Sequence, residues 1–185
     1  MAGQALHGRA VPTRERKGRD LRVILPYTKR IAAVTAALDA TGYEYEPIDV
    51  SESQSKYFQV IQSLWNAGET FATNEHDIVP NSNTFKDFDE CAADWCIAPY
   101  NYAVMPNGFY AGLGCCKISS RLIARNYDAM DRVGQMRDND HKQRHWCRVD
   151  GWLKQMLLEN GEAPHAHETV NHLGSGWPAH GCHKK

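Results

Sequence analysis

The feature that most constrains the fold is an alternation of short apolar segments with amphipathic segments, which starts near Leu21. Residues 21–25 are apolar except for Arg22 and are followed by Pro26, which is typical of a short buried strand. The next segment carries apolar side chains at helical spacing and ends at Gly42, a common position for glycine after a helix. Strands that alternate with helices predict an α/β fold with a mostly parallel central sheet.

The same patterns predict the later elements. We expect strands at residues 43–50, 70–74, 95–100, 115–118 and 168–172, and helices at residues 55–68, 81–92, 121–133 and 149–157. Ser55 is the expected cap of the second helix, and the charged residues 137–144 are expected to form a loop. The fold class is therefore predicted as a single α/β three-layer, Rossmann-like sandwich, with no internal repeats.

Size and composition exclude several classes of protein. A chain of 185 residues with 42% hydrophobic residues suits one soluble domain with a full core. A formal net charge of -1 argues against a protein whose whole surface binds nucleic acid. The sequence has no apolar run long enough to span a membrane and no secretory signal, so we expect a cytoplasmic protein. Residues 1–20 are basic and polar and predict a flexible leader.

The cysteines and histidines raise the possibility of a second kind of site, a metal site near the C-terminus. The six cysteines include no C-x-x-C pair, so no standard zinc or redox spacing is present, and reduced thiols are expected. Residues 164–185 are crowded with potential metal ligands: His165, His167, His172, His180, Cys182 and His183. We therefore treat residues 175–185 as a separate His/Cys-rich tail that could bind a metal ion.

Two carboxylates follow the predicted strand at residues 70–74. Glu75 and Asp77 are one residue apart, so an extended chain would place both on one face before Pro80. Carboxylate oxygens suit a hard divalent cation, which can in turn hold a diphosphate. Two other predicted strands end in the polar segments 26–28 and 49–51, and ligands of parallel sheets bind at such strand ends.

The order of these motifs resembles the nucleotide-sugar glycosyltransferases of family 2, which have the GT-A fold. The matching segments are Leu25-Pro26-Tyr27-Thr28, Asp49-Val50-Ser51-Glu52-Ser53, Glu75-His76-Asp77, Gly112-Leu113-Gly114-Cys115-Cys116, Asp150-Gly151-Trp152-Leu153 and Thr169-Val170-Asn171-His172. The resemblance covers residues 20–174 and is greatest to small members from phage and actinobacterial genomes. The chain departs from the family in having Glu75 for the first Asp of the Asp-x-Asp motif, and in its short length.

The resemblance implies a role for each matching residue. It implies that Asp150 is the general base of an inverting transfer to an acceptor hydroxyl, and that residues 21–174 form the catalytic domain. The implied ligands of Mn²⁺ or Mg²⁺ are Asp77, Glu75 and His172, with His165 or His167 as substitutes for the histidine. The implied donor-binding residues are Pro26, Tyr27, Thr28, Asp49, Ser51, Glu75, His76, Gly112 and Gly114. The acceptor could be a protein, a glycan or a modified nucleic acid, and a phage-encoded enzyme would act in the host cytoplasm.

Structural explanations stand beside these functional ones. Asp77 and Asp49 could shape turns, Asp150 could cap a helix, and the two glycines could serve turns alone. Trp95, Tyr100 and Tyr110 could stack on a sugar, although aromatic residues of this kind are more often core. Two other functions remain open: a zinc-binding module built on the C-terminal histidines and cysteine, and a metal-dependent hydrolase that uses Glu75, Asp77 and the histidines.

Overall fold

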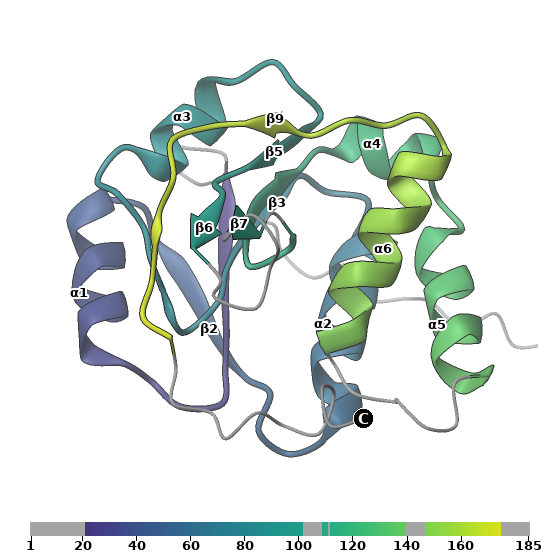
Figure 1. The fold of residues 1–185 in the computed structure, drawn as a ribbon, viewed down its shortest axis with the longest axis horizontal. Helices are drawn as coiled ribbons and strands as arrows, with labels where there is room; N and C mark the ends of the chain where they lie inside the picture. The colour runs from purple at the N-terminus through teal and green to yellow at the C-terminus, as the bar shows by residue number, and fades with distance from the viewer. Residues whose placement is uncertain (1–20, 102–108, 111, 140–146, 175–185) are drawn as a thin grey trace, which may run out of the picture.

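A computed structural model describes residues 21–101, 109–110, 112–139 and 147–174 of the chain. The predicted leader, residues 1–20, and the predicted tail, residues 175–185, lie outside the described residues. Within those residues the chain forms a mixed α/β fold with six helices around a central sheet (Figure 1). The α/β class predicted from the alternating segments is therefore confirmed.

Six strands form the central sheet in the order β2-β1-β3-β8-β5-β9. Their bounds are β1 Arg22–Tyr27, β2 Tyr45–Asp49, β3 Phe71–Asn74, β5 Trp95–Ile97, β8 Cys115–Ile118 and β9 His165–Ala166. The pairs β1–β2, β1–β3 and β5–β9 are parallel, whereas β8 runs antiparallel to both of its neighbours. The sheet is thus mostly parallel, and the start of β8 lies beside the end of β3, with Cys115 opposite Asn74.

Helices cover both faces of the sheet (Figure 1). Their bounds are α1 Ala32–Thr41, α2 Gln54–Ala67, α3 Thr84–Glu90, α4 Ser120–Arg125, α5 Ala129–Asn139 and α6 Cys147–Glu159. Alternate side chains of each strand enter different cores. Val23 and Cys96 pack with residues of α1 and α3, whereas Ile24 and Ile97 pack with residues of α2, α5 and α6.

Helix ends follow the sequence signals in part. Gly42 and Gly68 end α1 and α2 with φ of 69° and 67°, a left-handed conformation that favours glycine. The cap of α2 is Ser53 rather than the expected Ser55.

The single helix predicted at 121–133 is wrong, because the chain forms α4 and α5 there. Asn126 leaves helical geometry between them, and its carbonyl oxygen accepts a hydrogen bond from the Trp65 indole at 3.0 Å. The loop predicted from residue 137 is also wrong in part, since α5 continues to Asn139.

Two small antiparallel pairs complete the described fold. In one, β4 (Ile78–Val79) pairs with β10 (Asn171–His172), and in the other β6 (Tyr100–Asn101) pairs with β7 (Phe109–Tyr110). Pro99 separates β6 from β5, so the predicted strand at 95–100 is divided in two. The C-terminal segment similarly forms β9 and β10 in place of one strand.

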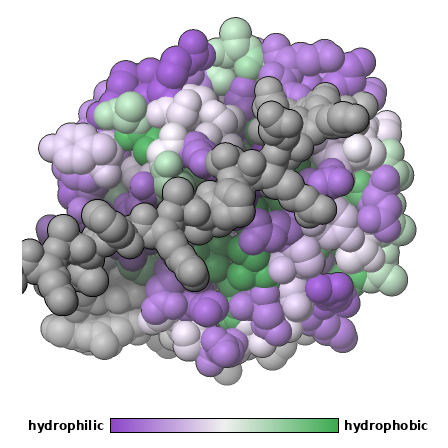
Figure 2. Space-filling view, turned by 180° about the vertical axis from the view of Figure 1, so that it is seen from behind, coloured by the Kyte–Doolittle hydropathy of each residue, from purple (hydrophilic) through white to green (hydrophobic). Residues whose placement is uncertain are grey.

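The surface is mainly hydrophilic on the face seen from behind. Figure 2 shows that apolar side chains appear near the centre of this face and that hydrophilic ones surround them. None of the helices in the described ranges is long and apolar enough to cross a membrane.

Candidate functional site at the strand ends

The polar segments predicted from the sequence meet at one edge of the sheet. Tyr27, the last residue of β1, is opposite Asp49, the last residue of β2, and β3 ends just before Glu75 on the other side of β1. Because these three strands are parallel, their carboxyl ends face the same way. This edge is the usual ligand position in parallel α/β sheets.

A tight turn carries the acidic motif. The Ile78 amide donates to the Glu75 carbonyl at 3.1 Å, and the buried Asn74 side chain donates to the carbonyls of Glu75 and Ile78 at 3.0 and 2.9 Å. Residues 75–77 are therefore outside strand β3, which ends at Asn74. The expectation that strand alternation places Glu75 and Asp77 on one face is wrong, because the chain turns there.

Asp77 is paired with His172. Asp77 Oδ2 lies 3.3 Å from His172 Nε2, and the two side chains are only 10% and 12% exposed. The pairing of β4 with β10 and a 2.9 Å bond from the Leu173 amide to the Asp77 carbonyl hold the two segments together. The His172 ring also stacks on Tyr100, with centroids 5.4 Å apart and planes 12° apart. The structure thus brings together two of the three predicted metal ligands.

Glu75 points to a different set of partners from those of Asp77. Its Oε1 accepts a hydrogen bond from the Tyr57 hydroxyl at 3.1 Å, and its amide donates to the Gly114 carbonyl at 2.7 Å. Burial raises the pKa of Glu75 well above its usual range, and the carboxylates of Asp150 and Asp77 raise it further. Burial and the two neighbouring carboxylates therefore favour the neutral acid form of Glu75, and its role as a metal ligand stays a prediction.

Asp150 reaches the same interior from the other side. It is buried in the first turn of α6, and its Oδ1 accepts a hydrogen bond from the Leu113 amide. Because α6 begins at Cys147, Asp150 is inside the helix and is not its cap. The effect of Asp150 on the pKa values of Glu75 and Tyr57 shows that these groups share one electrostatic environment.

His76 and Thr28 link the turn to the end of β1. His76 Nε2 lies 3.5 Å from the Thr28 hydroxyl oxygen, and the imidazole is buried. Burial lowers the pKa of His76, the nearby His172 lowers it further, and Asp77 partly opposes the shift. His76 is therefore neutral near pH 7 and can accept or donate one hydrogen bond at each ring nitrogen.

The predicted nucleoside-binding residues are the most exposed part of the site. Asp49 is exposed, and its Oδ1 accepts a hydrogen bond from the Ser51 amide at 2.8 Å. A hydrogen bond from the Ser51 side chain lowers the pKa of Asp49, and the bond from the amide lowers it further. Pro26 is buried within β1, whereas Tyr27 is partly exposed. The bond between Asp49 and Ser51 is also what a structural turn would require.

Sequence reasoning missed a cation at this edge. Arg30 is exposed, its guanidinium carbon lies 4.9 Å from the centroid of the Tyr27 ring, and its charge helps to lower the pKa of Asp49. A guanidinium beside the ends of β1 and β2 suits an anionic group. The sequence signal that could have indicated this role was the position of Arg30, four residues after Pro26 at the end of the first strand.

The glycines and aromatic residues are mainly packing residues. A Cβ atom on Gly114 would lie 2.5 Å from the Tyr100 hydroxyl and 2.7 Å from Ile78 Cδ1, so Gly114 is required for close packing. Trp95 is buried in the core beside α2, and Tyr100 is 4% exposed under His172. Gly112 is buried in the bend before β8. The side chain of Tyr110 lies outside the described residues.

A second cluster of ligands was not expected from the spacing of the cysteines. Among the described residues, the trio that places its ligand atoms within 4.8 Å of one another is Cys91, Cys96 and His167. Glu75, Asp77 and His172 do not form such a trio. The cysteine spacing could not predict this cluster, because a distant histidine joins two cysteines that no standard motif relates.

Comparisons with known proteins bear on the fold alone. No protein-family model matches the chain, and no curated protein matches it. Among solved structures, the crystal structure of A197 from STIV is similar, with a TM-score of 0.52 and 12% sequence identity. The similarity covers 80% of this chain and 83% of that one. It supports a shared α/β architecture across most of the chain.

Proposed function

We propose that this chain is a metal-dependent glycosyltransferase with a GT-A-like sandwich, which transfers a sugar from a nucleoside-diphosphate donor to an acceptor hydroxyl. The observation that carries the proposal is the Asp77–His172 pair at the edge where β1, β2 and β3 end. A carboxylate and an imidazole converge there beside two further buried acids, Glu75 and Asp150. Such a grouping is more than a surface turn requires.

The donor set suits a divalent cation of intermediate hardness. A carboxylate oxygen and an imidazole nitrogen are acceptable to Mn²⁺, whereas Mg²⁺ prefers oxygen ligands. Asp77 and His172 would hold the cation, and Arg30 would bind the diphosphate from the β1 side. When bound, the cation supplies charge neutralisation for the leaving diphosphate. Asp49, Ser51 and Thr28 would bind the nucleoside at the exposed part of the edge.

Asp150 is the proposed general base. The hydrogen bond from the Leu113 amide orients the Asp150 carboxylate, which would accept a proton from an acceptor hydroxyl. A base placed opposite the leaving group gives an inverted product. Burial raises the pKa of Glu75, and a neutral Glu75 would keep the interior from accumulating three negative charges.

Ligand-dependent stability tests the donor site directly. A nucleoside diphosphate at about 100 times its Kd should stabilise the protein by about 2.7 kcal/mol in the presence of Mn²⁺, which raises Tm by several degrees. Asp77→Asn should abolish the Mn²⁺-dependent part of this shift, while Asp131→Asn, at an exposed position on α5, should retain it. Failure of every common nucleoside diphosphate to shift Tm would remove the proposal.

A metal-dependent hydrolase is the second candidate, because Glu75, Asp77 and His172 could also hold a metal ion that activates water. Release of nucleoside diphosphate from a panel of sugar donors separates the two functions. A transferase releases it faster when a suitable glycan, protein or nucleic-acid acceptor is added, whereas a hydrolase gains nothing from any acceptor. Transfer of labelled sugar to the acceptor would identify the transferase.

A further inference from the structure

The fold brings three soft or borderline ligands together on the α1 and α3 face of the sheet. Cys91 follows the last residue of α3, Cys96 is the central residue of β5, and His167 follows β9. Parallel pairing of β5 with β9, and a 2.8 Å bond from the His167 amide to the Ile97 carbonyl, hold the histidine beside Cys96. The ligand atoms of the three side chains lie within 4.8 Å of one another.

The protein alone leaves this cluster incompletely bonded. Nε2 of His167 is buried and has no hydrogen-bond partner. The Cys96 thiol makes a long contact, 3.8 Å, to the Ala93 carbonyl and also interacts with the side chains of Cys91 and Lys117. An unpaired buried imidazole nitrogen is costly, and a metal ion is one of the few groups that can satisfy it beside two sulfurs.

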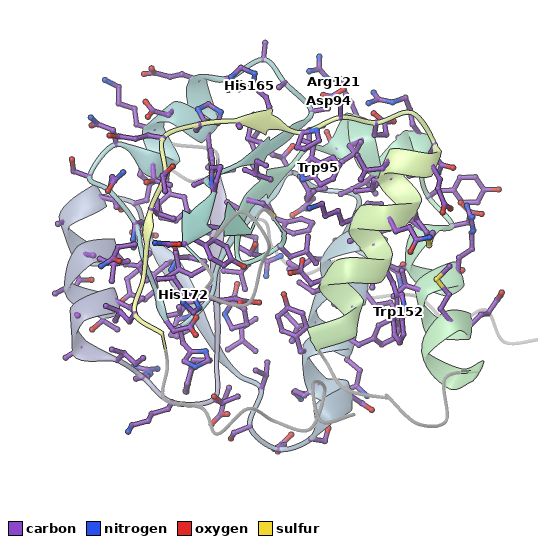
Figure 3. All side chains as sticks on the ribbon, in the orientation of Figure 1. Asp94, Trp95, Arg121, Trp152, His165 and His172 are labelled. Atoms are coloured by element: carbon purple, nitrogen blue, oxygen red, sulfur yellow. The ribbon has the colours of Figure 1, made fainter. Side chains whose placement is uncertain are left out.

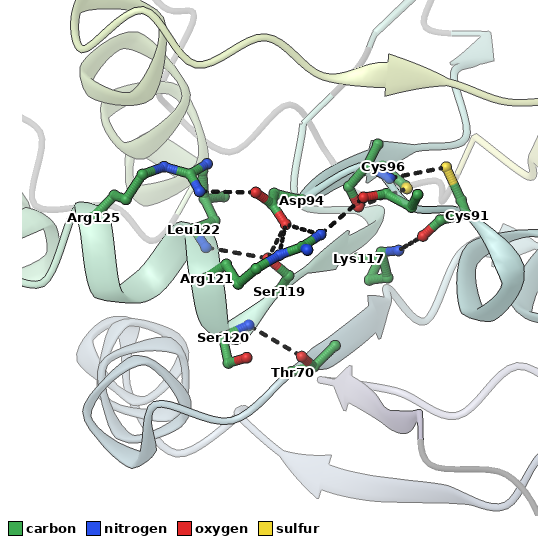
Figure 4. Close-up of polar contacts among 12 residues, drawn as sticks. Thr70, Cys91, Asp94, Cys96, Lys117, Ser119, Ser120, Arg121, Leu122 and Arg125 are labelled. Carbon is green, nitrogen blue, oxygen red and sulfur yellow. Dashed lines mark hydrogen bonds and ion pairs between the residues drawn. The ribbon is translucent and has the colours of Figure 1, made fainter.

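Two groups beside the cysteines oppose the effect of burial and would stabilise thiolate ligands. The Ala93 amide donates to Cys91 Sγ at 3.4 Å, and Lys117 donates to the Phe88 and Cys91 carbonyls at 2.7 Å each, close to both cysteines (Figure 4). Both groups would stabilise negative charge on sulfur. Two thiolates neutralise a divalent cation, so the lysine would face a site with no net positive charge.

Other uses of the cluster fit less well. Burial raises the pKa of Cys96 to about 12, so the thiol is a poor nucleophile in the metal-free chain. Asp77 and His172 contact each other at the strand-end site, so they are not additional ligands for an ion held by the Cys91, Cys96 and His167 cluster. The cluster therefore has a chemistry of its own, which does not depend on the proposed transferase function.

We propose that Cys91, Cys96 and His167 form a zinc site that ties the C-terminal segment to α3 and β5. Two sulfurs and one imidazole nitrogen are a standard set of three protein ligands for zinc, with a water molecule in the fourth position. Binding would release the two thiol protons to solvent. The site differs from a metal-binding tail, because its ligands all lie before residue 168.

The same segment carries His172, so zinc would also restrain the strand-end site. His165 and His172 lie at opposite ends of this segment (Figure 3). Between them, the Val170 amide donates to the Pro99 carbonyl at 2.9 Å.

Cobalt substitution of the full-length protein tests the proposal. The protein is purified without an affinity tag, stripped with a chelator under reducing conditions and titrated with Co²⁺, followed by Zn²⁺. We expect about one Co²⁺ per chain, with tetrahedral visible absorption and a thiolate charge-transfer band that Zn²⁺ removes. Zinc should also raise Tm, because it binds only the folded arrangement.

Matched variants assign the ligands. Cys91→Ser, Cys96→Ser and His167→Gln should each weaken metal binding by more than about 100-fold, since each removes a ligand rather than a supporting group. Cys115→Ser, at a thiol equally buried in neighbouring β8, should retain the charge-transfer band, as should a chain that ends at Gly174. If Cys96→Ser fails to fold, the less buried Cys91 and His167 decide the outcome.

Three results would overturn the proposal. One is a stripped protein that takes up no Co²⁺ with a thiolate band. Another is a band that survives in Cys91→Ser and His167→Gln but is lost when the chain ends at Gly174. The third is a disulfide between Cys91 and Cys96 in protein purified under reducing conditions, shown by mass spectrometry after thiol alkylation.

Discussion

Asp77 and His172 are far apart in the sequence, yet Oδ2 of Asp77 lies 3.3 Å from Nε2 of His172. The contact joins the turn after β3 to the last described strand, β10. The contact therefore holds the C-terminal segment beside the strand ends, and the Tyr100 ring stacks on the His172 imidazole. A binding site that depends on this pair depends on the correct placement of the whole segment.

The pair should show measurable coupling. Asp77→Asn and His172→Gln should each lower the free energy of unfolding by about 1 kcal/mol, because each leaves a partly buried polar partner behind. The double variant should lose less than the sum of the two, by about 0.5 kcal/mol or more. Urea unfolding of the four proteins provides the double-mutant cycle. Strict additivity would show that the two groups do not interact in solution.

Asp150→Asn should separate catalysis from binding. The amide oxygen of asparagine can still accept the hydrogen bond from Leu113, so the fold and the donor affinity should change little. Loss of the base should lower the rate of transfer by about 100-fold or more. Single-turnover rates and the Mn²⁺-dependent Tm shift measure the two effects, and Asp131→Asn is the matched control. A variant with normal turnover would eliminate Asp150 as the base.

Glu75→Gln should stabilise the protein at neutral pH. The folded pKa of Glu75 is raised, so its favourable contribution is complete only below the usual pKa of a glutamic acid and is lost as the pH rises toward the folded pKa. Glutamine keeps an acceptor for the Tyr57 hydroxyl and removes the charge. We expect an increase of about 1 kcal/mol at pH 7 and little change at pH 4, measured by urea unfolding. A less stable variant at pH 7 would contradict this assignment.

The sequence predicted the sheet better than the site. Local patterns were sufficient for β1, α1 and α2, because apolar spacing and the glycines after each helix act within a few residues. The convergence of residues 26–28, 49–51 and 75–77 followed from parallel strand direction alone. These predictions required no knowledge of distant contacts.

Long-range contacts account for the errors. Asn126 divides a predicted helix because the Trp65 indole binds its carbonyl, and no local pattern contains that partner. Glu75 turns toward Tyr57, which the alternation of strand residues could not reveal. Cys91, Cys96 and His167 meet through the pairing of β5 with β9, a strand that was not predicted at residues 165–166.

An ion-pair network at the other edge of the sheet should contribute to acid sensitivity. Asp94 accepts hydrogen bonds from Ser119, Arg121 and Arg125 at 2.7–2.9 Å (Figure 4). Despite partial burial, the hydrogen bonds from Arg125, Ser119 and Arg121 lower the pKa of Asp94 from 3.8 to about 2. Its stabilising effect is therefore complete above about pH 4 and is lost as the pH falls toward 2.

Asp94→Asn should remove this contribution. Since both arginines are largely exposed, we expect a loss of only about 1 kcal/mol at pH 7. The difference from the wild-type protein should shrink as the pH falls below 4, which urea unfolding at several pH values can follow. Asp131→Asn should leave the acid dependence unchanged. A constant difference down to pH 2 would show that the carboxylate charge is not responsible.

Gly114 and Gly151 directly follow Leu113 and Asp150, the two residues joined by a hydrogen bond. Replacement of these two glycines by alanine should have opposite effects on stability. At Gly114, a Cβ atom would lie 2.5 Å from the Tyr100 hydroxyl, so Gly114→Ala should cost about 1–3 kcal/mol through overpacking. At Gly151, next to Asp150 in α6, a Cβ atom would meet nothing within 4 Å. Gly151→Ala should therefore stabilise the helix by up to about 1 kcal/mol.

The comparison also tests how the strand-end site is supported. Tyr100 stacks on His172, so displacement of Tyr100 by Gly114→Ala should weaken the Mn²⁺-dependent Tm shift as well as the fold. Gly151→Ala should leave that shift intact, because its added methyl group touches no residue of the Asp77–His172 pair. Thermal unfolding with and without Mn²⁺ and a nucleoside diphosphate measures both properties in one experiment. An unchanged Mn²⁺-dependent shift in Gly114→Ala would show that Tyr100 does not hold His172 in place.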